Sequence, residues 1–119
     1  MENNANKKPM AMSGARNGLR NGADYIASLQ DGRSVWIDGE RIKDVTVDRR
    51  FRGAIQSIAD LYDIQCDPAL QDKMTFESPT SGARVGRSFM LPRSADDLRL
   101  RREMMKTWMD AVGGMMGRT

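Results

Sequence analysis

Apolar residues recur at helical spacing in two segments of the first half of the chain. A short helix is predicted from about Gly22 to residues 31–32, because its apolar residues share one face (Tyr25, Ile26 and Leu29). Asp24 lies in its first turn, where a carboxylate favours the free N–H groups. A longer amphipathic helix is predicted from about residue 48 to residue 63, where apolar residues stand three or four positions apart (Phe51, Ile55, Ile58, Leu61 and Tyr62).

A third and longer helix is predicted near the end of the chain. Ser94 is a typical N-cap, and the acidic pair Asp96 and Asp97 suits the first turn of a helix better than a catalytic site, because adjacent helical residues point in different directions. We expect one apolar face to run along this helix, which weakens or ends at residues 113–114 (Leu98, Met105, Trp108, Val112 and Met115, widened by Met104 and Met109).

The segment from residue 34 to residue 45 predicts a β-hairpin. Two strand-forming runs flank Asp38 and Gly39, and Asp-Gly suits a tight turn in which both central residues have positive φ. Two strands alone are marginal in water, so their apolar side chains need cover from a helix or another domain. Taken alone, these elements predict a small α+β domain.

The remaining segments are less regular. Pro68 predicts a turn between residues 66 and 72. Residues 74–77 and 88–91 are short apolar stretches, read as strands or extended segments on either side of a loop at residues 78–86. Residues 1–21 carry no apolar periodicity and are predicted to be a disordered tail, so that the domain comprises residues 22–119.

Composition narrows the chemistry that this chain can perform alone. It has 119 residues, one cysteine (Cys66) and no histidine, which argues against a disulfide, a zinc site and imidazole catalysis. The net charge of +3 comes from scattered basic residues with few aromatics between them, so we expect no nucleic-acid partner. No apolar run is long enough to span a bilayer, and we expect a cytoplasmic protein without a membrane partner.

Several conspicuous residue types have ordinary structural interpretations. The methionines near the C-terminus are expected to fill a core or an interface rather than bind a metal. Trp36 and Trp108 are expected to be packing residues, and the glycines at residues 82–86 form no dinucleotide-binding pattern. On composition alone, Arg118 is a terminal surface arginine.

Several runs, in order, resemble one family. They are residues 25–33 (YIASLQDGR), 39–46 (GERIKDVT), 51–52 with 58–63 (FR and IADLYD), 70–72 (LQD), 94–99 (SADDLR) and 116–119 (MGRT). Together they resemble the N-terminal part of the 4-hydroxyphenylacetate 3-monooxygenase family, over residues 22–119. The pattern departs from the family where a His-Pro pair is usual, because Asp48 and Arg49 stand there instead; aspartate can also cap a helix.

The resemblance implies a fold that is mainly α with a β-hairpin, namely the N-terminal helical domain of an acyl-CoA-dehydrogenase-like flavin monooxygenase. In such enzymes a separate flavin reductase supplies reduced FAD, and a homotetrameric oxygenase component uses O₂ to hydroxylate a phenolic ring. The central β domain and the C-terminal helical bundle, which bind most of the flavin, are absent here, so the resemblance assigns no cofactor-binding residue to this chain and predicts an inactive fragment that needs the rest of the oxygenase subunit.

One catalytic residue carries over from the family, on the Gly-Arg-Thr motif. Arg118 looks like the arginine that contacts the phenol and the oxygen-bearing flavin, a task that suits a permanent cation. The family's next catalytic groups, a tyrosine and a histidine, would follow Thr119.

Three other interpretations stay open. The chain could be a non-catalytic protein-interaction module or relic of the family, using its Met-rich helix to bind another polypeptide. It could be a fragment of a 4-hydroxybutyryl-CoA dehydratase-like enzyme, which uses an iron–sulfur cluster as well as FAD, although the closing Gly-Arg-Thr favours the monooxygenases. A small nucleic-acid binder is the third, and would lose binding steeply with salt.

Overall fold

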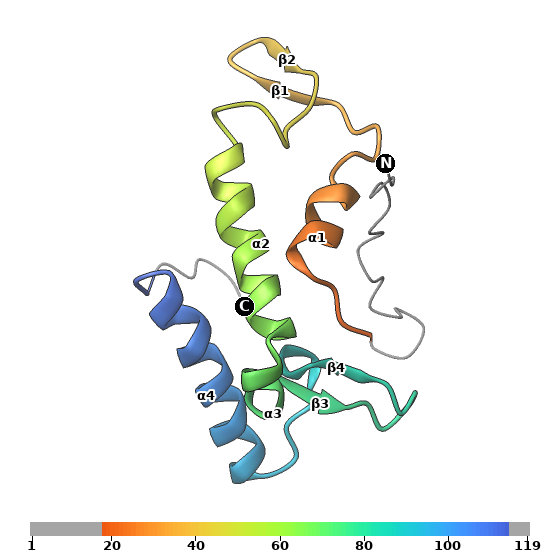
Figure 1. Ribbon diagram of the computed structural model, residues 1–119, viewed down its shortest axis with the longest axis vertical. Coiled ribbons are helices and arrows are strands. Elements are labelled where there is room, and N and C mark those ends of the chain that lie inside the picture. The colour runs from red at the N-terminus through yellow and green to blue at the C-terminus, as the bar shows by residue number, and fades with distance from the viewer. Residues whose placement is uncertain (1–17, 115–119) are drawn as a thin grey trace, which may run out of the picture.

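Three longer helices and two small hairpins make up the described chain. The structure is a computed structural model and describes residues 18–114. Its elements, in chain order, are α1 (Gly22–Ser28), β1 (Val35–Ile37), β2 (Glu40–Ile42), α2 (Arg52–Cys66), α3 (Gln71–Met74), β3 (Thr75–Glu77), β4 (Arg84–Gly86) and α4 (Ala95–Ala111), with 3₁₀ turns at Pro68–Leu70 and Arg87–Phe89. The α2 helix lies between α1 and α4 (Figure 1). The fold class predicted from the sequence is confirmed, with a second hairpin added.

The N-terminus of α1 is closed by a capping box. The Asn21 side chain accepts a hydrogen bond from the Asp24 backbone N–H at 2.8 Å, and the Asp24 carboxylate accepts one from the Asn21 N–H at 3.2 Å. Gly22 is buried against α2, where its N–H donates to Asp63 at 2.8 Å. The helix ends at Ser28, slightly earlier than predicted.

The first hairpin forms as predicted. Its strands are antiparallel, with Val35 opposite Ile42, and the turn residues have positive φ (48° at Asp38 and 77° at Gly39). Ile42 is buried, whereas Trp36 is 62% exposed. The prediction that Trp36 is a packing residue is therefore wrong within the described residues. An exposed indole is explained by its place on the outer face of a two-stranded sheet.

The α2 helix begins four residues later than predicted. Asp48 does not cap the helix, because its carboxylate accepts hydrogen bonds from the backbone N–H and the guanidinium of Arg50. The same guanidinium reaches Glu40 of β2 at 2.9 Å and so ties the hairpin to the start of α2. Ile58, predicted on the buried face, is 41% exposed.

A second hairpin joins β3 and β4, with Phe76 opposite Val85. The strand expected at residues 74–77 is therefore confirmed for Thr75–Glu77, but its partner lies in the predicted loop and not at residues 88–91. Arg87 turns the chain out of the sheet after β4, because its buried side chain donates to the backbone carbonyls of Asp72, Lys73 and Thr75.

The α4 helix starts at the predicted cap, where Ser94 accepts from the Asp97 N–H at 3.1 Å. Its predicted apolar face is only partly buried. Met104 is 1% exposed, but Leu98 is 58% exposed and Met109 is 38% exposed. The apolar arc of α4 is wider than the surface that the neighbouring elements cover.

The core of the described residues is small and rich in methionine. Its buried apolar members come from β2, α2, α3, α4 and the segment after β4 (Ile42, Ile55, Ala59, Met74, Met90 and Met104). This outcome agrees with a filling role for Met104. The predicted disordered tail lies outside the described residues for positions 1–17 and stays a prediction.

Candidate functional site

Arg118, the one catalytic residue predicted from the sequence, lies outside the described residues. The α4 helix carries the chain toward it and ends in a glycine turn. The N–H groups of Val112 and Gly114 both donate to the Met109 carbonyl, at 3.2 Å and 2.7 Å, and Gly113 and Gly114 have φ of 62° and 80°. This left-handed backbone favours glycine and turns the chain away from the helix axis.

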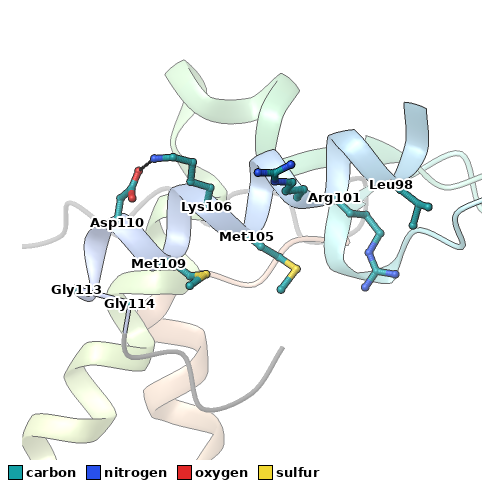
Figure 2. Close-up of a pocket in the computed structure, with 9 residues that line it drawn as sticks. Leu98, Arg101, Met105, Lys106, Met109, Asp110, Gly113 and Gly114 are labelled. Carbon is teal, nitrogen blue, oxygen red and sulfur yellow. Dashed lines mark hydrogen bonds and ion pairs between the residues drawn. The ribbon is translucent and has the colours of Figure 1, made fainter. Parts of the chain in front are cut away.

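A groove of about 700 Å³ runs along the exposed side of α4. Its apolar residues are Leu98, Met105 and Met109, which stand seven and four positions apart and therefore share one helix face. Figure 2 shows Met105 and Met109 pointing from the same side of the helix. We call this surface the α4 groove; the other side chains that line it are polar (Arg101, Arg102, Lys106 and Asp110).

The polar residues of the α4 groove are mostly basic. Lys106 pairs with Asp110 at 2.6 Å on the exposed surface, which leaves the two arginines as the excess charge. Within residues 18–114, Arg101 Nε is buried and has no hydrogen-bond acceptor. A buried donor without an acceptor is uncommon in a folded protein, and no hydrogen bond within residues 18–114 holds that guanidinium.

An adjacent side of α4 is held against the rest of the fold. Trp108 Nε1 donates to the Leu61 carbonyl of α2 at 3.0 Å, across 47 residues of sequence, and Met104 is buried. These contacts fix the rotation of α4 about its own axis. The α4 groove is therefore exposed because a different side of the helix packs against the core. In the sequence, the signal for such a groove was an apolar arc too wide for one buried face.

A second hollow lies beside the β3–β4 hairpin. It is lined by Phe76 and by two exposed apolar residues that follow β4, Phe89 at 77% and Leu91 at 69%. The hollow is open and contains no group suited to acid–base work other than Glu77, an exposed carboxylate at the end of β3. Its exposed apolar lining is typical of a surface that a partner covers, and not of a catalytic site.

The polar groups with altered pKa values have structural roles. Hydrogen bonds from Arg50 lower the pKa of Asp48 to about 2, and those from Arg33 lower the pKa of Asp31 to about 2. Burial raises the pKa of the Cys66 thiol, which contacts the Arg20 carbonyl at 3.4 Å. A protonated thiol is a weak nucleophile, so Cys66 is a poor candidate for catalysis.

Asp96 and Asp97 serve the start of α4, as predicted. Asp97 accepts from the Arg93 N–H at 2.8 Å, and Asp96 pairs with Arg99 at 2.8 Å. In the described part of the chain, no group of three His, Cys, Asp or Glu residues could hold a metal ion. None of the helices described is both long enough and apolar enough to cross a bilayer.

Comparison with known families and proteins gives one consistent result. Residues 21–119 match the family profile described as 4-hydroxyphenylacetate 3-hydroxylase N terminal. The oxygenase component of 4-hydroxyphenylacetate 3-monooxygenase from Escherichia coli is 44% identical over 99 residues, which are 82% of this chain and 19% of that protein. The chain thus spans about a fifth of the length of such relatives.

Solved structures give the same match in three dimensions. The oxygenase component of 4-hydroxyphenylacetate 3-monooxygenase, complexed with FAD and 4-hydroxyphenylacetate, aligns with a TM-score of 0.77 and 40% identity over 84% of this chain and 21% of that one. An archaeal 4-hydroxybutyryl-CoA dehydratase from N. maritimus aligns with a TM-score of 0.69 and 28% identity, over 80% of this chain and 19% of the other.

Proposed function

Because the chain belongs to the 4-hydroxyphenylacetate 3-hydroxylase family, we propose that it forms the N-terminal part of the oxygenase component of a two-component monooxygenase. The enzyme uses FADH₂ and O₂ to hydroxylate a phenolic ring, such as that of 4-hydroxyphenylacetate. The observation that supports this most directly is the match to a structure that holds both FAD and 4-hydroxyphenylacetate. The partners are a flavin reductase and the rest of a homotetrameric oxygenase, in the cytoplasm.

Arg118 is the contribution of this chain to the chemistry. It occupies the Gly-Arg-Thr motif that follows α4. A guanidinium is always charged and presents several donors in a fixed plane, so it stabilises a phenolate in a pocket of low dielectric. An ionised phenol is richer in electrons at the ring carbon next to the oxygen, which favours hydroxylation there.

The described residues do not form a flavin site by themselves. The two larger hollows are open surface grooves, and neither has a glycine-rich loop at the N-terminus of a helix to receive phosphates. We expect FAD to be held mainly by the part of the oxygenase subunit that lies outside these 119 residues. Water exclusion from the reaction likewise requires that polypeptide, so the chain alone is expected to be inactive.

A chimera tests this proposal. Residues 21–119 replace the matching region of the E. coli relative, and catechol formation from 4-hydroxyphenylacetate is measured with FAD and a flavin reductase. We expect the chimera to be active, and Arg118→Ala to lose about 100-fold or more in kcat, as when a group that stabilises developing charge is removed. Arg118→Lys should keep an intermediate rate.

Arg99→Ala is the matched control, because Arg99 is an exposed arginine on α4 that pairs only with its helical neighbours Asp96 and Glu103 among the described residues. Its rate should equal that of the parent chimera. A folded, flavin-binding chimera without hydroxylation would refute the function, and so would an Arg118→Ala variant as fast as Arg99→Ala. A folded but inactive chimera would favour the non-catalytic interaction module.

The dehydratase is the second candidate, because its structure also aligns well. Its lower identity argues against it, and this chain has only Cys66 to offer an iron–sulfur cluster. Grafting residues 21–119 onto the N. maritimus dehydratase should give an inactive protein. Dehydratase activity in that graft, with an inactive monooxygenase chimera, would reverse our assignment.

A further inference from the structure

We propose that the α4 groove is the docking surface for the polypeptide that follows the matched region in the relatives. This inference rests on the proposed function. The occupant is an apolar segment flanked by carboxylate or backbone carbonyl acceptors. Its apolar side chains lie on Leu98, Met105 and Met109, and its acceptors meet Arg101 and Arg102.

The first step is that the apolar residues of the groove are not buried in the core of the described chain. Trp108 and Met104 hold the adjacent side of α4 against the core, so the helix cannot rotate to bury Leu98 and Met109 without losing these contacts. Both residues stay exposed next to the half-buried Met105 on one continuous face. Exposed apolar faces of this kind mark interaction surfaces, and methionine adapts its shape to a partner.

The second step is the charge around the groove. Lys106 is neutralised by Asp110, but no hydrogen bond or ion pair joins Arg101 or Arg102 to another residue within 18–114. An arginine fork without acceptors binds carboxylates and carbonyls in two-point contacts. The surface therefore combines an apolar centre with arginine donors at its edges. This combination suits a protein segment better than an aliphatic or a polyanionic ligand.

The third step identifies the occupant. The family profile describes an N-terminal region, and that region is about a fifth of the relatives, so most of each relative follows it along the chain. Gly113 and Gly114 line one end of the groove and turn the chain there. In a relative, the polypeptide that follows the matched region therefore starts beside the groove, where docking needs no long connection.

A binding experiment in two pieces tests the inference. This 119-residue chain, tagged at its N-terminus, is co-expressed with the E. coli oxygenase component lacking its own matched region, and capture of that fragment on the tag is quantified. The E. coli matched region is the positive control. We expect this chain to capture the fragment, and Leu98→Glu and Met105→Glu each to reduce capture about ten-fold or more.

Ala111→Glu is the matched control, because Ala111 is exposed on α4 but is not among the residues that line the groove. It should capture as much fragment as the unchanged chain, and circular dichroism should show equal helix content in all four proteins. Arg102→Glu, which leaves the apolar residues of the groove unchanged, should weaken capture because it replaces an attraction to the acceptors of the segment with a repulsion.

Two results would overturn the inference. One is failure of the unchanged chain to capture the fragment while the E. coli region does. The other is equal capture by Met105→Glu and Ala111→Glu. Self-association of the chain alone that Met105→Glu abolishes, without capture of the fragment, would show that a second copy occupies the groove instead.

The outcome is separable from that of the proposed function. If capture depends on Met105 but the chimera is inactive, the proposed function is refuted and the docking surface is supported. An active chimera whose rate and thermal stability are unchanged by Met105→Glu would remove the docking surface and keep the function.

Discussion

Arg87 offers the sharpest test of what holds this fold together. Its side chain is only 8% exposed, and its guanidinium donates to the carbonyls of Lys73 at 3.0 Å, Asp72 at 2.7 Å and Thr75 at 2.8 Å. The first two carbonyls belong to the last turn of α3, where helical carbonyls have no partner within the helix. Arg87 therefore closes α3 and joins it to the second hairpin.

Replacing Arg87 with methionine keeps most of the aliphatic stem and removes all three hydrogen bonds to carbonyls, together with the weaker one from Nη1 to Met90 Sδ at 3.7 Å. A hydrogen bond from a charged donor contributes about 1.5–3 kcal/mol net, but water can reach some of the freed carbonyls, so the three do not add fully. We expect Arg87→Met to cost about 3–5 kcal/mol, as when one partner of a buried charged network is removed. The free energy of unfolding of a small domain is about 5–15 kcal/mol, so this loss would be a large share of it.

Urea unfolding followed by far-ultraviolet circular dichroism measures the effect. The matched control is Arg84→Met on the neighbouring strand, because Arg84 is half-buried and its side chain makes one hydrogen bond among residues 18–114, to Thr75 Oγ1 at 3.1 Å. It should cost about 1 kcal/mol. Equal losses in the two variants would refute the reasoning, because they would show that the three carbonyls gain nothing from the guanidinium.

Three further predictions follow from other contacts. The Asp48 carboxylate has a lowered pKa, so the stability it contributes is present above its ordinary pKa of 3.8 and is lost as pH falls toward about 2; the unfolding midpoints of the parent and Asp48→Asn should differ at neutral pH and converge at pH 2. Gly22→Ala should cost about 1–3 kcal/mol in urea unfolding, because the added Cβ would stand 2.6 Å from the Ala59 carbonyl oxygen; an unchanged midpoint would contradict this close approach. The isolated chain, mixed with FAD, a flavin reductase and 4-hydroxyphenylacetate, should form no catechol, and substantial product would disprove its dependence on further polypeptide.

The sequence alone was enough to predict the elements whose geometry depends on a few neighbouring residues. Asp38 and Gly39 specify a turn with positive φ, and Ser94 specifies a helix start, so both could be placed without knowledge of the fold. The resemblance to the monooxygenases added the fold class, which the structural match confirms.

Features that depend on distant contacts could not be placed in this way. Arg84–Gly86 forms a strand because it pairs with Thr75–Glu77, although its arginine and glycine are more typical of a loop. A buried Arg87 is equally unexpected, because arginine is seldom buried without a partner and its partners here are backbone carbonyls, which no sequence pattern reveals.

The side of α4 that faces the core was also undetermined by the sequence. Both Met104 and Met109 fit an apolar face, and only packing against α2 and α3 makes the first a core residue and the second an exposed one. The assignment of Arg118 remains a proposal for a related reason. Its role depends on groups that other polypeptide supplies, and a motif of three residues carries no geometry.

The distribution of apolar side chains connects the folding of this chain with its assembly. Among the described residues, more large apolar side chains remain exposed than are buried in the core (exposed are Trp36, Val47, Ile58, Phe89, Leu91, Leu98 and Met109). A partner that binds only the folded chain and covers part of this surface stabilises it by mass action. We expect the same docking step to exclude water from the pocket that we propose around Arg118, where a low dielectric would strengthen the effect of its charge. Stability and catalytic competence should therefore rise together on assembly, and a Leu98→Glu change that weakens docking should lower both in the chimera.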